Sequence, residues 1–507
     1  MGIVFRQSIK TTIIIFSGAI LGALSTWLFT FIDKQQYGFT RELLTQAVIV
    51  SQFLALGFNA TMSVYIHRYD HDDRKRHTLI GLCLLVPLVA CVIASAIYFV
   101  FPGHSIHALF QEQDQGLMWR YFIWLPLYGV FFVFQMIIEQ YLTAQMKIAQ
   151  LSFIREIVLR LISIVLVLLF VFHYINFDVL LIGTVVGSLL SLGVLFLISM
   201  RTKDFGIALH RKAFTNKEYK EIFRFSFFHT LTAISIYLIG FLDMFLLGRF
   251  DKEGVRSVAV YAVGVFIISV VQIPARAMIN AAYTNIAKEF TNGDMPLVRN
   301  LYGRLALNSL LASMLMAVIV CCNLNNAVAI MGKGGVTGTG YGAVIPVVLI
   351  LLIGQLINIA TGMNDQILSI SKYYRVSFYL SASLVVVLSG LCIVLIPKYG
   401  VYGAAWSTTI ALGLYNLGKY FFTWVKMGIQ PLSKNTIRVI IANVPGFAAG
   451  YFMPFLFNNH TRPFVALDAT VRSALIVIIY IGMLFILKPS PDVREYVANI
   501  RKTKRLF

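Results

Sequence analysis

The chain has 507 residues, of which 58% are hydrophobic and only 13% are charged. Soluble domains carry about 25% charged residues, so this composition excludes a soluble protein and indicates an integral membrane protein. The net charge of +20 invites a nucleic-acid partner. The basic residues fall in the short loops between apolar runs, however, where anionic lipid headgroups lie, so we expect no nucleic acid to bind.

Apolar runs long enough to cross a bilayer recur along the whole chain and predict about fourteen transmembrane helices. A spanning segment must satisfy its own backbone hydrogen bonds, and runs of about 20 residues do so as helices. The predicted fold class is therefore all-α, a polytopic membrane protein. The expected spans are residues 11–32, 43–66, 78–102, 120–142, 156–175, 179–200, 225–247, 257–282, 305–330, 343–363, 376–397, 403–425, 437–457 and 472–488.

A basic segment divides the predicted spans into six before it and eight after it. The first and seventh spans end alike, with Asp33-Lys34 and Asp251-Lys252 followed by a short loop and a new apolar run. This similarity predicts two six-helix lobes in a pseudo-twofold repeat, with two helices added. The expected domains are an N-terminal lobe at 1–200, a linker at 201–224, a C-terminal lobe at 225–425, and two extra helices with a basic tail at 426–507. Lys and Arg concentrate in alternate loops, which places both termini in the cytoplasm.

Three cations lie inside the predicted spans. An intramembrane charge costs several kcal/mol unless it faces protein or a water-filled cavity, so it is a functional candidate by default. Arg276 either reaches the headgroups or binds phosphate, because its planar fork of donors matches phosphate oxygens. Arg160 follows Glu156 by four residues, so the two are predicted to pair on one helix face. Lys419 lies two turns from Lys426, and we expect its ammonium to reach toward the headgroups, with substrate binding in the cavity as the alternative.

Three acids are candidate sites for coupling to H⁺ or Na⁺. Glu139, near the end of the fourth span, is either a partner for one of the cations or a protonatable group. Asp243, near the outer end of the seventh span, either titrates or binds Na⁺, or else marks the membrane interface. Asp365 follows the tenth span and either lines the same cavity or forms hydrogen bonds between helices.

Polar residues inside the spans are candidates for lining that cavity. Gln46 and Asn59 interrupt the second span, which suggests a helix that does not face lipid. Asn358 lies in the tenth span and either lines the cavity or bonds a neighbouring helix. No HExxH, GxSxG or phosphate-loop pattern occurs, so we expect no catalytic residues, no metal and no cofactor beyond a coupling ion.

Two stretches resemble a known family. FLDMFLLGRF and the following VYAVGVFIISVVQIPARAMINAAYTNIAKEF are similar to the seventh and eighth spans of Wzx-type polysaccharide flippases, and IPKYGVYGAAWSTTIA is similar to the beginning of that family's twelfth span. These flippases belong to the multidrug/oligosaccharidyl-lipid/polysaccharide (MOP, MATE-like) exporter superfamily. The resemblance implies a protein of the bacterial inner membrane, not an enzyme, that moves undecaprenyl-diphosphate-linked oligosaccharides to the periplasmic leaflet by alternating access.

The resemblance also implies a pathway and residue roles. The pathway is export of polysaccharide, including the O-antigen of lipopolysaccharide, with membrane lipids and the polymerase and assembly machinery as partners. The resemblance implies that Arg276, and after it Arg160, binds the diphosphate. It also implies that the apolar tail of the lipid-linked substrate lies beside the two added spans.

Other functions remain open at this point. The sequence barely distinguishes a polysaccharide flippase from a lipid II flippase. A MATE-like cation-coupled drug exporter would need acids in its cavity, whereas arginines are the more prominent buried charges here. A membrane glycan polymerase or ligase would carry a large outer loop, and the longest one expected here, 102–119, has only about 17 residues.

Overall fold

The computed structural model describes residues 3–69, 71–109, 111–145, 147–202, 204–210, 213–331, 341–371, 373–456 and 461–495. Every regular element within these ranges is a helix, which confirms the predicted all-α class. Contacts divide the chain into two compact units, Met1–Ala259 and Val260–Phe507.

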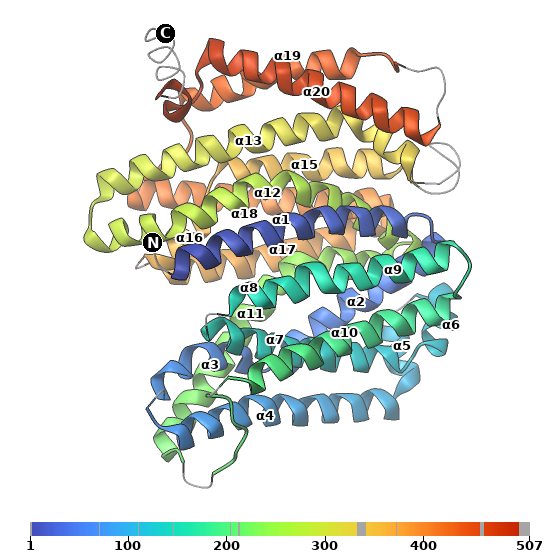
Figure 1. The fold of residues 1–507 in the computed structure, drawn as a ribbon, viewed down its shortest axis with the longest axis vertical. Coiled ribbons are helices and arrows are strands. Elements are labelled where there is room, and N and C mark those ends of the chain that lie inside the picture. Colours follow the sequence, from blue (N-terminus) through green and yellow to red (C-terminus); the bar gives the residue numbers. More distant parts are fainter. Residues whose placement is uncertain are drawn as a thin grey trace. The chain divides into compact units, whose positions relative to one another are not determined.

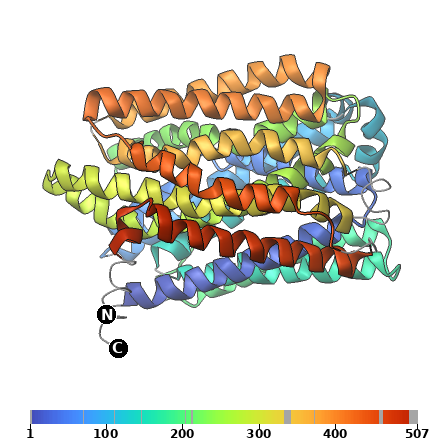
Figure 2. The same ribbon diagram turned by 90° about the horizontal axis from the view of Figure 1, so that it is seen from above.

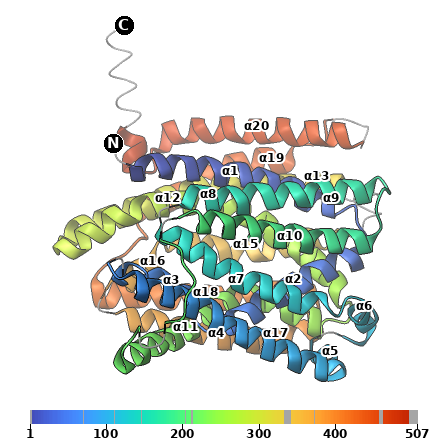
Figure 3. The ribbon, with the colours of Figure 1, turned by 60° about the horizontal axis from the view of Figure 1, so that its bottom comes forward.

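The first unit holds the helices that precede α12. They are α1 (Ile3–Phe29), α2 (Lys34–Leu54), α3 (Phe58–Tyr65), the 3₁₀-helix η1 (His67–Tyr69), α4 (Asp73–Val100), α5 (Pro102–Leu109), the 3₁₀-helix η2 (Glu112–Asp114), α6 (Gln115–Arg120), α7 (Trp124–Ala144), α8 (Ile148–Phe153), the π-helix η3 (Ile154–Val158), α9 (Leu159–Val171), α10 (Phe177–Met200) and α11 (Asn216–Phe250). In this unit α1 packs along α8 and α9, as Figure 3 shows, and α2 packs against α7 and α11.

The second predicted span is a broken helix. Its two halves, α2 and α3, meet at an angle of 59°. Leu56 and Gly57 at the break have φ angles of 47° and 71°, and the glycine adopts this left-handed backbone without a steric penalty. A side chain at Gly57 would also clash with the carbonyl of Ser226 on α11, whose hydroxyl lies 2.5 Å from that of Thr61. The break is therefore buried against protein, where irregular backbone is tolerated at membrane depth.

The second unit holds the remaining helices. They are α12 (Val255–Asn292), whose first five residues belong to the first unit, α13 (Met295–Ile330), α15 (Val344–Ala360), α16 (Asn364–Ile370), α17 (Tyr374–Tyr399), α18 (Val401–Met427), α19 (Lys434–Phe452) and α20 (Arg462–Leu487). The two orange helices α17 and α18 lie side by side (Figure 2), and α15 packs on α18 and α13. The hairpin of α19 and α20 packs along α13 (Figure 1).

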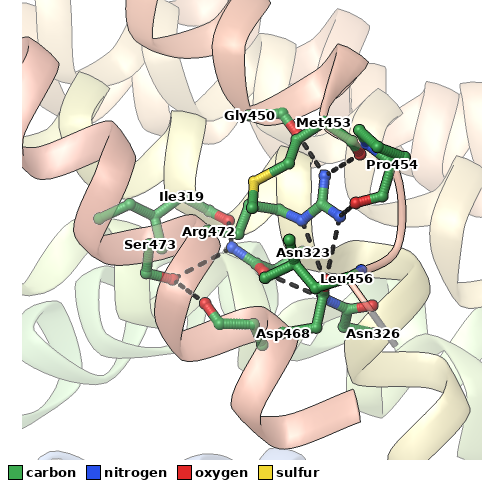
Figure 4. A network of polar contacts seen from close by, with 11 residues as sticks. Ile319, Asn323, Asn326, Gly450, Met453, Pro454, Leu456, Asp468, Arg472 and Ser473 are labelled. Carbon is green, nitrogen blue, oxygen red and sulfur yellow. Dashed lines mark hydrogen bonds and ion pairs between the residues drawn. The ribbon is translucent and has the colours of Figure 1, made fainter. Parts of the chain in front are cut away.

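A buried ionic network ties this hairpin to α13 (Figure 4). Asp468 and Arg472, one turn apart on α20, are only 1% and 5% exposed and lie 3.1 Å apart between Oδ2 and Nη2. Arg472 donates to the carbonyls of Gly450 and Met453 at the end of α19, which satisfies groups that a helix C-terminus leaves unpaired. Asn326 of α13 donates to Asp468 over 2.7 Å. Because each charge has partners, the network is a structural clamp.

The number of spans is not confirmed. Among the described residues, seven helices are long and apolar enough to cross a membrane, or eight if α2 and α3 count as one. The count of fourteen therefore stays a prediction, although each predicted run overlaps a helix or a broken helix. The lobe boundaries also stay predictions.

Candidate functional site

Four charged side chains form a continuous chain in the first unit. Arg155 Nη1 lies 3.5 Å from Glu139 Oε2, and its Nε lies 3.1 Å from Glu156 Oε1. Arg160 Nη2 lies 2.7 Å from the other oxygen of Glu156 and also donates, through Nη1, to the carbonyl of Gly18 on α1. The predicted pairing of Glu156 with Arg160 is confirmed, and Glu139 is the partner of a cation. These charges balance one another across α7, η3, α9 and α1.

Two glycines of α1 and the π-helix shape this chain. A Cβ at Gly18 would lie 2.7 Å from Glu156 Cβ, and one at Gly22 would overlap the Arg160 guanidinium. The spacing of these glycines is the G-x-x-x-G pattern, which lets a neighbouring helix approach closely. Residues Ile154–Val158 form a π-helix, a feature that occurs frequently at functional sites. Glu156 and Arg160 thus lie against α1 at two positions where it has no side chain.

The second unit pairs two of the predicted residues. Lys419 Nζ, 2.8 Å from Asp365 Oδ2, also lies 3.8 Å from the ring centroid of Tyr415. The Tyr415 hydroxyl donates to the other Asp365 oxygen over 2.8 Å. Lys419 is only 1% exposed, so the expectation that its ammonium reaches the lipid headgroups is wrong. Asp365 supplies inside the protein the charge and hydrogen bond that water would otherwise provide.

A helix break beside this pair gathers further polar groups. Gly362, between α15 and α16, has a φ of 69°. The Tyr302 hydroxyl of α13 donates to the carbonyl of Thr361 over 2.5 Å and also contacts the Asn364 side-chain amide. The Thr361 hydroxyl donates to the carbonyl of Asn358 over 2.9 Å. Asn358, one of the predicted residues, thus joins this group of polar contacts through its backbone carbonyl. The break beside it is a discontinuity between helices of the kind that forms binding sites in transporters.

Arg276 differs from the other cations of the predicted site. It lies on α12 within the candidate span Val255–Ile279 and is exposed. Its Nη2 donates to Gln272 Oε1, and Gln272 Nε2 donates over 2.5 Å to Gln355 Oε1 of α15. Among the residues that the structure describes, no carboxylate pairs with Arg276. Its guanidinium is oriented by a glutamine chain and keeps donors available for an anion.

The remaining predicted residues lie in the first unit. Gln46 Nε2 donates over 2.9 Å to Glu42 on the same helix, and Asn59 is buried on α3 just after the break. Asp243 is 6% exposed on α11, and its Oδ1 accepts from the backbone N–H of Met244 over 2.8 Å. The expectations that Gln46 and Asn59 line a cavity and that Asp243 couples an ion stay predictions.

Comparison with known proteins identifies the family. Residues 4–284, more than half of the chain, match the family described as polysaccharide biosynthesis protein. The chain belongs to this family. No curated protein matches its sequence.

The fold of this polysaccharide biosynthesis protein is similar to those of several solved structures. The chain is similar to lipid II flippase MurJ in an inward closed conformation, with a TM-score of 0.73 at 15% identity over 94% of this chain and 98% of that one. It is also similar to an inward-facing multidrug resistance MATE transporter of the MOP superfamily, with a TM-score of 0.65 at 13% identity over 82% and 98%. A MOP superfamily transporter from Pyrococcus furiosus gives 0.55 at 14% identity over 84% and 95%. The family member therefore has the MOP transporter fold.

Sequence reasoning missed several side chains of these networks, among them Arg155, Tyr415 and Gln272. Arg155 lies directly before a predicted span and counts there as a loop cation. Tyr415 precedes Lys419 by four residues, and Gln272 precedes Arg276 by four, so helical spacing was the available signal for both. In this family member some partners lie one turn away on the same helix, whereas Glu139 and Asp365 reach their cations from other helices.

Proposed function

We propose that this chain is a flippase that moves an undecaprenyl-diphosphate-linked oligosaccharide from the cytoplasmic to the periplasmic leaflet of the bacterial inner membrane. A sugar diphosphate cannot enter hydrocarbon, because its hydroxyls and charges would lose their water. Family membership and the MOP transporter fold support transport over catalysis. In the proposed mechanism two six-helix lobes alternate between inward-open and outward-open states, and the α19–α20 hairpin offers an apolar surface to the prenyl tail.

The observation that carries this proposal is the exposed guanidinium of Arg276. It lies in a candidate span, and the described residues provide it with no carboxylate. A cation so placed favours an anionic substrate and disfavours the cationic drugs of a multidrug exporter. Guanidinium binds phosphate oxygens through two parallel hydrogen bonds, and the contact with Gln272 leaves other donors of the fork available.

The other predicted residues act around this anchor. Arg160 and Lys419 are neutralised by Glu156 and Asp365, so we assign them to positioning rather than to first contact with the diphosphate. We assign coupling to H⁺ or Na⁺ to the acidic residues. Glu139 and Asp365 would change partners during the transport cycle, and Asp243 is a further candidate. The polysaccharide polymerase and its assembly machinery would receive the product.

The test replaces Arg276 with Ala and with Lys and follows surface glycan together with lipid-linked oligosaccharide retained inside the cell. A charge-assisted hydrogen bond contributes about 1.5–3 kcal/mol, so Arg276→Ala should lower export by roughly 10- to 100-fold at normal membrane expression. Partial rescue by Lys would assign the role to charge more than to the planar fork. Lys288→Ala, an exposed cation on the same helix, is the matched control and should export normally. Full export by both Arg276 variants would remove Arg276 from substrate binding.

A lipid II flippase is the second candidate, favoured by the extent of the similarity to the MurJ structure. Both substrates present a prenyl diphosphate, so the same arginine serves either function. The two candidate functions can be distinguished in a cell whose own lipid II flippase is depleted. Growth supported by this chain would identify lipid II as substrate, whereas loss of surface glycan without effect on growth identifies an oligosaccharide.

A further inference from the structure

Glu42 of α2 is a buried carboxyl that sequence reasoning did not select. Its side chain is 0% exposed. Oε1 accepts a hydrogen bond from Gln46 Nε2 over 2.9 Å, whereas Oε2 is buried and has no hydrogen-bond partner. The carboxyl faces Gly248 of α11, where a built Cβ would lie 2.7 Å from Glu42 Cδ and 2.8 Å from Oε2. A backbone without a side chain therefore leaves just enough room for this group.

No cation balances Glu42 within the described residues. The adjacent Arg41 points away, with its Nε 3.2 Å from the Tyr37 hydroxyl and its guanidinium over the rings of Phe29 and Tyr37. Helices α4, α7 and α11 pack against α2, and the beginning of α12 approaches it at Gly38. Among the described residues, no ion pair joins any of these helices to Glu42. The charged group that acts on Glu42 across space is Asp114, which has the same sign.

A carboxylate in such a place is costly. Burying an ionised carboxyl without a partner costs far more than burying a neutral one, so the group takes up a proton instead. We propose that Glu42 is a proton-binding site of the first unit, which holds its proton while α2 and α11 are in contact and exchanges it only when that contact opens to water.

The contact between α2 and α11 suits such an opening. Thr45 Oγ1 of α2 contacts Met244 Sδ over 3.1 Å, and farther along α11 the Ser226 hydroxyl shares a hydrogen bond with Thr61 of α3. These are neutral contacts, which separate without exposing an unpaired charge. A role of the proton in driving transport rests on the proposed flippase function, but its presence at Glu42 does not.

Infrared spectroscopy of the purified full chain at neutral pH tests the presence of the proton. A protonated carboxyl has a carbonyl stretch separate from that of carboxylates, and this band should be lost in Glu42→Gln. Gln46→Leu should shift the band and keep it, because it removes the hydrogen bond to Oε1. Glu221→Gln, in which the lost carboxylate pairs with Arg68 over 2.6 Å, is the matched control and should leave the band unchanged. Identical spectra for wild type and Glu42→Gln would overturn the proposal.

Transport in vesicles tests the exchange. An imposed pH gradient should change the rate of flipping of a lipid-linked oligosaccharide several-fold in wild type and by clearly less in Glu42→Gln. An equal response of both proteins would show that the proton never exchanges and would contradict the proposal. A wild-type chain that flips no such lipid would instead contradict the proposed function, and the infrared band would still decide the protonation of Glu42.

Discussion

Buried charges in this chain are balanced in two different ways at the scale of single residues. Arg160 and Arg472 each bond an acid one turn away, and each also donates to a backbone carbonyl of another helix. Lys419 instead depends on Asp365, which lies 54 residues away in the chain. A buried charge that loses its partner is strongly destabilising, because the desolvation cost remains without the attraction.

The pair of Lys419 and Asp365 gives the first prediction. Lys419→Met and Asp365→Asn should each destabilise the protein, and the double variant should recover much of the loss, with a coupling of about 0.5–3 kcal/mol. Thermal unfolding in detergent of wild type, both single variants and the double variant measures this coupling. Additive losses would show that the two side chains do not interact in solution.

The two cases differ in what could be predicted from sequence. Glu156 and Arg160 are neighbours on any helix that contains both, so their pairing follows from local geometry alone. The partner of Lys419 depends on how α16 packs against α18, and no spacing in the sequence encodes that contact. Arg276 is intermediate, since its position in a span is predictable whereas the glutamine chain that orients it requires α15.

Two broken helices set the local geometry at the scale of elements. α2 and α3 break at Gly57, and α15 and α16 are separated at Gly362. Breaks free backbone groups, which at membrane depth must be satisfied by protein. Tyr302 does so at the second break, and its ring packs close to Gly362. The sequence predicted one continuous span, 43–66, across the first break, because hydropathy does not detect a left-handed residue. The predicted span 343–363 ends at the second break and leaves α16 out.

Gly362→Ala is the prediction at this scale. The left-handed backbone costs an L-residue about 1–2 kcal/mol, and a Cβ would meet Ala306 Cβ at 3.0 Å and Tyr302 Cε2 at 3.1 Å. The variant should therefore unfold at lower temperature than wild type. Gly390→Ala is the control, since Gly390 is helical in α17 with nothing within 4 Å of its built Cβ. That change should be neutral or slightly stabilising, and equal losses in both variants would refute the argument.

At the scale of the whole molecule, the end of the basic segment 201–224 is fastened to the first unit. Lys75 Nζ lies 2.7 Å from Glu218 Oε1, and Arg68 Nη1 lies 2.6 Å from Glu221 Oε1. Both acids are on the first turns of α11, and both bases are near η1 and α4. The two ion pairs therefore hold the beginning of α11 against η1 and α4.

This connection predicts an acid-sensitive stability. The hydrogen bond from Lys75, together with the Thr215 N–H, lowers the pKa of Glu218 below its ordinary value of 4.5. The stabilisation is thus fully present above pH 4.5 and is lost as the pH falls through the lowered pKa. Unfolding measured from neutral to acid pH should show a steeper loss for wild type than for Glu218→Gln. Lys75→Met should reduce the slope as well, and three equal slopes would contradict this account.

The all-α membrane class, the approximate positions of the helices and the location of several charges inside them could be predicted from the amino-acid sequence. These properties follow from composition and from hydrogen bonding within single segments, so they need no knowledge of neighbours. The packing of helices was needed to see that Lys419 is paired, that Glu42 faces a glycine with no counter-ion among the described residues and that Arg472 caps α19. Each depends on which side chain another helix brings within a few ångströms, and packing between distant segments alone fixes that.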